Sequence, residues 1–150
     1  MTLDQLIDNV ETRVYALGKR IWPDDPRAEL RAEIERVSIE LQEHVEQATR
    51  YRSAIEEARA RIADHEFRAA QLASRVETYV HTGDQVRAWR HALELDRVRR
   101  HMADIRAGLP GADKALGQHR AHIDRLERCL QELQAQLQTR QQRAPAPSSR

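Results

Sequence analysis

The seven histidines are the residues of this 150-residue sequence that could most readily bind a metal ion or change charge with pH. A neutral imidazole binds divalent transition metals, and its protonation near neutral pH adds a positive charge. His119 and His122 are three residues apart, which places them on one face of a helix. Whether other histidines lie near this pair depends on how the helices pack, and the periodicity of the sequence predicts that packing.

No catalytic constellation accompanies the histidines. The sequence contains no phosphate-binding glycine loop and no pair of cysteines with metal-ligand spacing. The single cysteine, Cys129, cannot form an internal disulfide, which is typical of the reducing cytosol. We interpret Cys129 as a partly buried thiol beside an apolar stripe. The sequence therefore predicts a protein that is not an enzyme, with no catalytic residue, no metal ligand set and no cofactor.

The composition indicates long helices. Charged residues make up 33% of the chain and aromatic residues only 4%, a balance typical of coiled coils rather than compact globules. No apolar run approaches the ~20 residues of a membrane span. The first residues lack the basic region and apolar stretch of a secretory signal. These observations predict an all-α protein in the cytoplasm.

Residues 26–81 carry a heptad repeat, which indicates a helix that buries one stripe against a partner. With Ile34 at position a, the repeat continues for more than four heptads. The a positions are Ile34, Leu41, Ala48, Ile55, Ile62, Ala69 and Val76, and the d positions are Leu30, Val37, His44, Tyr51, Ala58, His65, Leu72 and Tyr79.

Residues 84–141 repeat in a frame of their own, two residues out of step with the first. In a straight helix, this shift of two residues would rotate the apolar stripe by ~200° about the helix axis. We therefore predict that the chain reverses at Thr82, Gly83 and Asp84. Gly83 can adopt the left-handed conformation that ends a helix, and Thr82 or Asp84 can cap the next one. The second a positions are Leu95, Met102, Leu109, Leu116, Ile123, Leu130 and Leu137, and the d positions are Val98, Ile105, Ala112, His119, Leu126 and Leu133.

The reversal predicts a long antiparallel helical hairpin, a coiled coil with arms 26–81 and 84–141. In the stretch "GLPGA" of the second arm, Pro110 removes a backbone donor, so we expect a kink or short break near this residue. Two segments flank the hairpin. An amphipathic helix over 2–22 precedes it, and a basic, Pro/Ser-containing tail over 142–150 follows it and is predicted to be disordered.

The antiparallel register brings histidines of the two arms together. Residues that face each other across the hairpin have numbers that sum to about 165, because both helices rise by the same amount per residue. His65 then lies near His101, and His44 lies near His119 and His122. Two such layers can bind a divalent metal or form a pH-sensitive weak point. The alternative is that their polar ends reach solvent or a neighbouring glutamate.

The segment 2–22 has apolar residues along one face and has two interpretations. In the first it lies in the interface of a bilayer, as amphipathic helices with an apolar anchor do. In the second it packs against the hairpin or another subunit. Its polar face carries Asp4, Asp8 and Glu11 beside basic residues, so insertion of apolar side chains has to supply the binding. The candidate membrane-binding residues are Leu3, Leu6, Ile7, Val10, Val14, Leu17, Ile21 and Trp22.

The two halves of the chain have opposite net charge. Residues 1–83 contain 12 basic and 16 acidic side chains, whereas residues 84–150 contain 13 and 8. This difference favours pairing of the arms, although exposed ion pairs contribute only ~0–1 kcal/mol each. The arginines of the second arm alternate with Glu94, Asp96 and Asp104, which is typical of a solvated face. We therefore predict no nucleic-acid partner.

Three stretches resemble the phage shock protein A (PspA) family, bacterial relatives of ESCRT-III. "DDPRAELRAEIERVSIEL" is similar to the Asp-Pro and helix start of that family. "GDQVRAWRHALELDR" is similar to its signature after the turn, with Arg90, Ala92 and Leu93 at matching positions and Trp89 in place of a small residue. "HRAHIDRLERCLQELQAQL" is similar to its leucine-rich second arm. The resemblance covers residues 3–140 and implies a short or truncated member, because the family's further helices do not follow.

The resemblance implies a non-enzymatic membrane-stress protein at the cytosolic face of the cell membrane. Such a protein would self-associate into a homo-oligomer through its hairpin and bind an anionic membrane surface through residues 2–22. It would also present a surface to an AAA+ transcription activator. One alternative is a soluble coiled-coil scaffold or adaptor without lipid contact. Another is a metal- or pH-responsive helical bundle built on the histidine layers.

Overall fold

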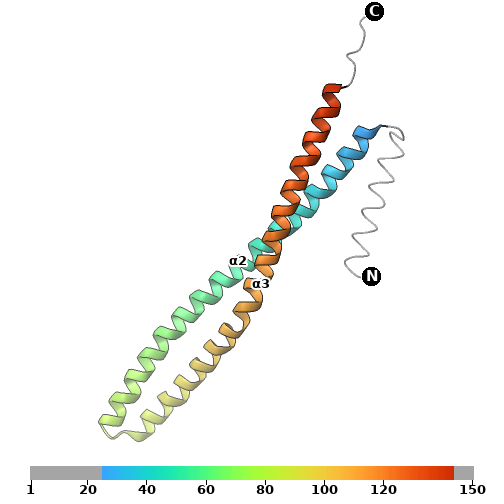
Figure 1. Cartoon of the computed structure of the whole chain (residues 1–150). Coiled ribbons are helices and arrows are strands. Elements are labelled where there is room, and N and C mark those ends of the chain that lie inside the picture. The colour runs from blue at the N-terminus through green and yellow to red at the C-terminus, as the bar shows by residue number, and fades with distance from the viewer. Residues whose placement is uncertain (1–24, 144–150) are drawn as a thin grey trace, which may run out of the picture. The chain divides into compact units, whose positions relative to one another are not determined.

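The computed structural model describes residues 25–143. Two α-helices make up almost all of this range: α2, Pro26–His81, and α3, Gln85–Arg143. The two helices run antiparallel and pack against each other as a hairpin (Figure 1). No strand occurs among the described residues. The all-α hairpin predicted from the sequence is therefore confirmed.

Both helices begin after an aspartate that caps the first turn. The backbone N–H of Arg27 donates to Oδ1 of Asp25 at 2.9 Å, and that of Arg87 donates to Oδ1 of Asp84 at 3.1 Å. These caps satisfy donors that have no partner within the helix, and such a cap contributes about 1 kcal/mol. Pro26 is the first residue of α2, where no backbone donor is needed. Local sequence thus sets where each helix starts.

The chain reverses at residues 82–84. Gly83 has a φ of 77°, in the left-handed region that strains any residue with a side chain. The N–H of Asp84 donates to the carbonyl of Tyr79 at 2.9 Å, and the N–H of Gly83 donates to that of Val80 at 3.2 Å. This is the Schellman arrangement, which satisfies the last carbonyls of a helix. The turn therefore depends on a single glycine.

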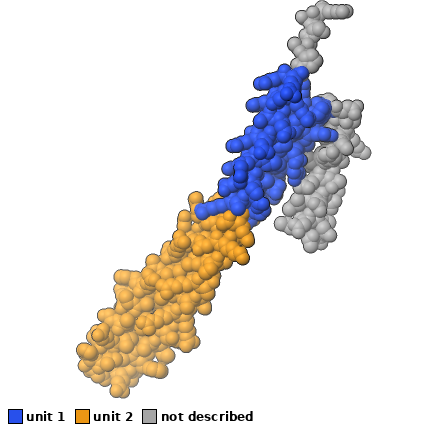
Figure 2. All heavy atoms as spheres, viewed as in Figure 1, with its two compact units in different colours: residues 1–46, 119–150 blue, residues 47–118 orange. Residues whose placement is uncertain are grey.

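Residues 47–118 form one of two compact units (orange in Figure 2). In this unit Leu72, Leu95 and Val98 make a buried cluster, and Ala69 packs against it. All four lie at a or d positions of the predicted repeats. Burying a leucine or valine side chain stabilises a fold by ~1.5–3 kcal/mol, so this apolar stripe holds the two helices together here.

The other unit combines residues 25–46 with residues 119–143 (blue in Figure 2). Its most deeply buried side chain is Val37, 1% exposed, at a d position of the repeat. Near the ends of the two helices, Nη1 of Arg140 donates to the backbone carbonyl of Pro26 at 3.2 Å. Buried apolar side chains of the repeat and this polar contact near the helix ends thus both help to join the two helices of this unit.

The bounds of α3 differ from those predicted. The helix is continuous through Pro110, so the short break that was one expected outcome is not found. Proline costs a helix interior about 3 kcal/mol, and buried apolar residues of the stripe, such as Leu116, favour helix beyond it. At its start, α3 begins at Gln85 because the preceding aspartate is its cap. At its end, α3 reaches Arg143 rather than residue 141.

The segments that flank the hairpin in the sequence analysis fall mostly outside the described residues. The predicted helix over 2–22 lies there entirely, as do residues 144–150 of the predicted tail. The prediction of disorder is wrong for residues 142–143, which belong to α3. Gln and Arg are good helix formers, so the helix extends through them. Neither described helix has the length and apolar character that crossing a membrane requires.

Candidate functional site

The residues predicted to bind a membrane lie outside the described residues, whereas the predicted turn residues form the turn described above. The functional features of the described chain are therefore side chains between the helices and on their outer faces. The membrane-binding candidates concerned are Leu3, Leu6, Ile7, Val10, Val14, Leu17, Ile21 and Trp22.

Three histidines meet between α2 and α3, in the unit that contains residues 25–46. Nδ1 of His44 lies 2.9 Å from Nδ1 of His119, and the two ring centroids are 5.1 Å apart. His122 stacks on His44 with centroids 4.7 Å apart and ring planes within 6°. A neutral imidazole has one donor and one acceptor nitrogen, so one Nδ1 donates its proton to the other. We call these three residues the His44 layer.

The surroundings of His44 favour its neutral form. Burial lowers the pKa of His44, and the positive charges of His122 and His119 lower it further. The carboxylates of Glu40 and Glu43 act in the opposite direction and raise this pKa, but they do not reverse the shift. A neutral imidazole is the form that binds metal ions.

Arg125 orients His122 from the same helix. Its Nη2 lies 3.3 Å from Nδ1 of His122. A guanidinium only donates hydrogen bonds, so this Nδ1 accepts. His122 is exposed, whereas His44 and His119 are half-buried. The layer is therefore reached by solvent on the His122 side.

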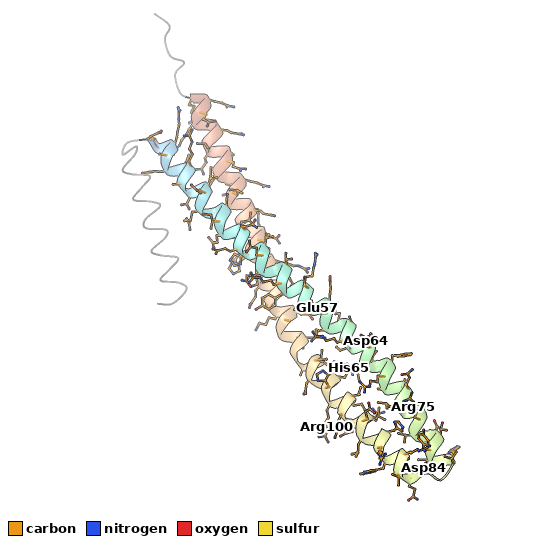
Figure 3. All side chains as sticks on the ribbon, turned by 180° about the vertical axis from the view of Figure 1, so that it is seen from behind. Glu57, Asp64, His65, Arg75, Asp84 and Arg100 are labelled. Carbon is orange, nitrogen blue, oxygen red and sulfur yellow. The ribbon has the colours of Figure 1, made fainter. Side chains whose placement is uncertain are left out.

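A second histidine layer lies in the unit of residues 47–118. His65, labelled in Figure 3, meets His101 edge to face, with centroids 4.9 Å apart and ring planes at 87°. A groove of about 530 Å³ opens beside the two rings. Three arginines and one glutamate line it, so its charge is positive. Its lining residues are His65, Arg68, Arg90, Leu93, Glu94, Arg97, Val98 and His101.

A third aromatic contact lies next to the turn. The rings of Tyr79 and His91 stack with centroids 5.3 Å apart and planes within 1°. The guanidinium of Arg87 lies 5.7 Å from the centroid of the Tyr79 ring, within the range of a cation–π contact. Nδ1 of His91 is buried without a hydrogen-bond partner. This contact was not predicted from the sequence, because His91 lies one heptad before the first d position of the second frame.

Two ion pairs connect the helices, one with its arginine on α3 and one with its arginine on α2. Arg106 of α3 pairs with Glu66 of α2, whereas Arg68 of α2 pairs with Glu94 of α3. All four side chains are at least 40% exposed, and exposed pairs contribute little. These exposed ion pairs therefore add little to the pairing of the helices, which comes mainly from the buried stripe.

An exposed apolar stripe lies on the outer face of α3. Val86, Trp89 and Leu93 are 64%, 66% and 45% exposed, and their spacing of three and four residues places them on one helix face. None lies at an a or d position of the predicted repeat, although Leu93 also lines the groove beside His65. We call these residues the outer stripe. The sequence analysis did not predict this stripe. The signal that could have revealed it was a set of apolar residues three and four positions apart that lie outside the a and d positions.

The described residues form no metal centre with three or more protein ligands. Across residues 25–143, no group of three or more His, Cys, Asp or Glu side chains is arranged to hold a metal ion. Cys129 is a free, half-buried thiol. Comparison of the chain with family models, curated proteins and solved structures gives no match. The resemblance to the PspA family therefore stays a prediction.

Proposed function

We propose that the protein is a non-enzymatic scaffold that self-associates through the outer stripe of its hairpin and attaches to a membrane through residues 2–22. The observation that carries the first part is the exposure of Val86, Trp89 and Leu93, which are 64%, 66% and 45% exposed. Large apolar side chains grouped on one outer face are typical of interaction sites, whereas scattered ones are not.

The occupant that this stripe fits best is a second copy of itself. In an antiparallel pair with a two-fold axis between Trp89 and Arg90, Val86 of one copy lies opposite Leu93 of the other. The guanidinium of Arg90 then lies beside Trp89 of the second copy, a favourable cation–π arrangement. Two-fold pairing requires this kind of self-complementary surface. The pattern Val-Trp-Arg-Leu is close to symmetric about that axis.

The size of the stripe predicts weak association. Stable interfaces bury roughly 1,200–2,000 Å² in total, more than three side chains from each copy supply. We therefore expect a dissociation constant on the order of micromolar for the pair. Attachment of several copies to one membrane would raise the effective concentration and strengthen the assembly.

Sedimentation velocity across a concentration series tests self-association. We expect Trp89→Glu to weaken it at least about tenfold, because aromatic residues at the centre of an interface contribute most of its energy. Phe67→Glu is the matched control. Phe67 is 69% exposed on α2, but its neighbours at i−4 and i+3 are Ala63 and Ala70. Equal loss in both variants, or a wild type that stays monomeric, would contradict the proposal.

The membrane part of the proposal is supported by the apolar periodicity of residues 2–22. Cosedimentation with vesicles tests it on the full chain. We expect binding by the wild type, and loss of binding by a variant with Ile7→Asp and Val14→Asp on the apolar face. Asp8→Asn, on the polar face, is the control and should bind as the wild type does. If neither the wild type nor the control binds, the protein is a scaffold without lipid contact.

A further inference from the structure

The proposed self-association through the outer stripe does not involve the His44 layer. We infer that His44 and His119 form a binding site for a divalent late transition metal, Ni²⁺ or Cu²⁺, which links α2 to α3. The two rings come from different helices and share their Nδ1 contact across the seam. An ion held by both would therefore tie this unit together.

The two nitrogens lie close enough together to bind one ion. Two imidazole nitrogens that bind one ion at ~2.0–2.1 Å lie about 2.9 Å apart when they occupy adjacent positions at ~90°, but about 3.4 Å apart in a tetrahedron. The observed Nδ1–Nδ1 distance is 2.9 Å. Because 2.9 Å is also the ordinary length of a hydrogen bond, the distance shows that both nitrogens can reach one ion but does not select its geometry. Cu²⁺ and Ni²⁺ are chosen because they bind nitrogen ligands most strongly among the divalent metals of their row. To bind the ion, the ring that donates in the Nδ1–Nδ1 hydrogen bond releases that proton to solvent and takes one up on Nε2, so that both neutral rings direct an Nδ1 lone pair at the ion.

The charges around the site are compatible with a cation. Glu40 and Glu43 raise the pKa of His44 through their negative charge, and the same field attracts a metal ion. Arg125 acts in the opposite sense but lies against His122, where it occupies Nδ1 at 3.3 Å. One nitrogen of His122 is thus taken by Arg125, and we place only His44 and His119 in the ligand set. The proposed site has two protein ligands, with water at its other positions.

Titration calorimetry of the full chain with NiCl₂ at pH 7.5 tests this site. We expect one ion per chain, with a dissociation constant on the order of micromolar. Removing either ligand, by His44→Ala or His119→Ala, should weaken binding at least about tenfold. His122→Ala and His65→Ala are matched controls. They delete an imidazole stacked on the site and one in the other layer, and both should retain the affinity of the wild type.

Electron paramagnetic resonance with Cu²⁺ identifies the ligands directly. The chain carrying Cys129→Ser, which prevents oxidation of the thiol, should show hyperfine coupling to two imidazole nitrogens, and His119→Ala should remove one of them. Far-ultraviolet circular dichroism checks that each variant is helical, and His44→Gln replaces His44→Ala if the latter unfolds. At pH 5.5 the affinity should fall, because protons compete with the metal.

Two results would overturn the site: no nickel binding by the wild type, or equal affinity in the wild type, His44→Ala and His119→Ala. The second result would place the ion elsewhere on the chain. The site does not depend on self-association, so Trp89→Glu should bind nickel with unchanged affinity. Failure of the metal site and failure of the scaffold are therefore distinguished by separate variants.

Discussion

The layers around Leu72 and His44 occupy the same heptad position, d, but differ in what they contribute. Leu72 is 3% exposed and packs in a cluster with Leu95 and Val98. His44 is half-buried and contacts two further histidines. The apolar layer contributes stability that does not depend on pH or ions, whereas the imidazole layer depends on both. The heptad position decides which side chains meet, and their chemistry decides whether the contact responds to conditions.

The largest difference between the two layers should appear on truncation. Leu72→Ala removes a buried side chain and leaves a cavity, which should lower the free energy of unfolding by about 3 kcal/mol. Urea denaturation should show this loss equally at pH 5 and pH 8. Leu93→Ala is the control, because Leu93 is 45% exposed and should change stability by less than about 0.5 kcal/mol. A similar loss in both variants would mean that Leu72 is not part of the core.

An intermediate effect is expected at the turn that both helices share. Gly83→Ala places a side chain in the left-handed region, which costs about 1–2 kcal/mol. A Cβ at Gly83 meets no atom within 4 Å, so the cost is that of the backbone alone. Gly117→Ala, inside α3 and also in open space, should instead stabilise by up to about 1 kcal/mol. Urea denaturation that gives both changes the same sign would contradict this account of the turn.

The smallest effect is the pH dependence of the His44 layer. The pKa of His44 in the folded state is below the ordinary value of about 6.5, so the unfolded chain takes up the proton more readily. Its contribution to stability is complete above about pH 6.5 and is lost as pH falls through the lower, folded pKa. The charged and titratable groups that act on this layer are Glu40 and Glu43 of α2 and His119, His122 and Arg125 of α3.

Thermal unfolding measures this dependence. The melting temperature of the wild type should be lower at pH 5 than at pH 8, and His44→Leu should reduce the difference. Leucine makes this layer more apolar, so the variant should also be at least as stable as the wild type at pH 8. His81→Leu, outside the heptad stripe, controls for a general effect of losing a histidine. If the difference in melting temperature between pH 5 and pH 8 is the same in His44→Leu as in the wild type, the His44 layer is not the source of that difference.

Much of the fold could be predicted from the sequence because the helices obey one strong periodicity. The frame slip located the turn, since only a reversal lets both stripes face each other. The same register brought His65 to His101 and His44 to His119, and these pairs are in contact in the structure. Heptad counting fixes which residues share a layer, so it could predict these neighbours.

The details of the candidate site could not be predicted in the same way. The contact between the Nδ1 atoms of His44 and His119 depends on side-chain rotamers, which periodicity does not specify. The outer stripe lies outside the heptad frame, and Trp89 was noted only as a departure from a family signature. At Pro110 a kink or a short break was expected, and the break does not occur because one lost hydrogen bond weighs less than apolar packing on both sides of it.

In the pairing that we propose, the outer face of α3 contacts a second copy in antiparallel register. Double electron–electron resonance on a chain with one spin label, at Asp96→Cys in a Cys129→Ser background, measures only distances between copies. Asp96 is exposed one heptad after Trp89. Packed helices lie about 8–10 Å apart and rise about 1.5 Å per residue, so the two labels should be on the order of 20 Å apart. A label at Phe67→Cys should give longer distances. Absence of any intermolecular distance near 20 Å for Asp96→Cys, at concentrations where sedimentation detects association, would contradict this pairing.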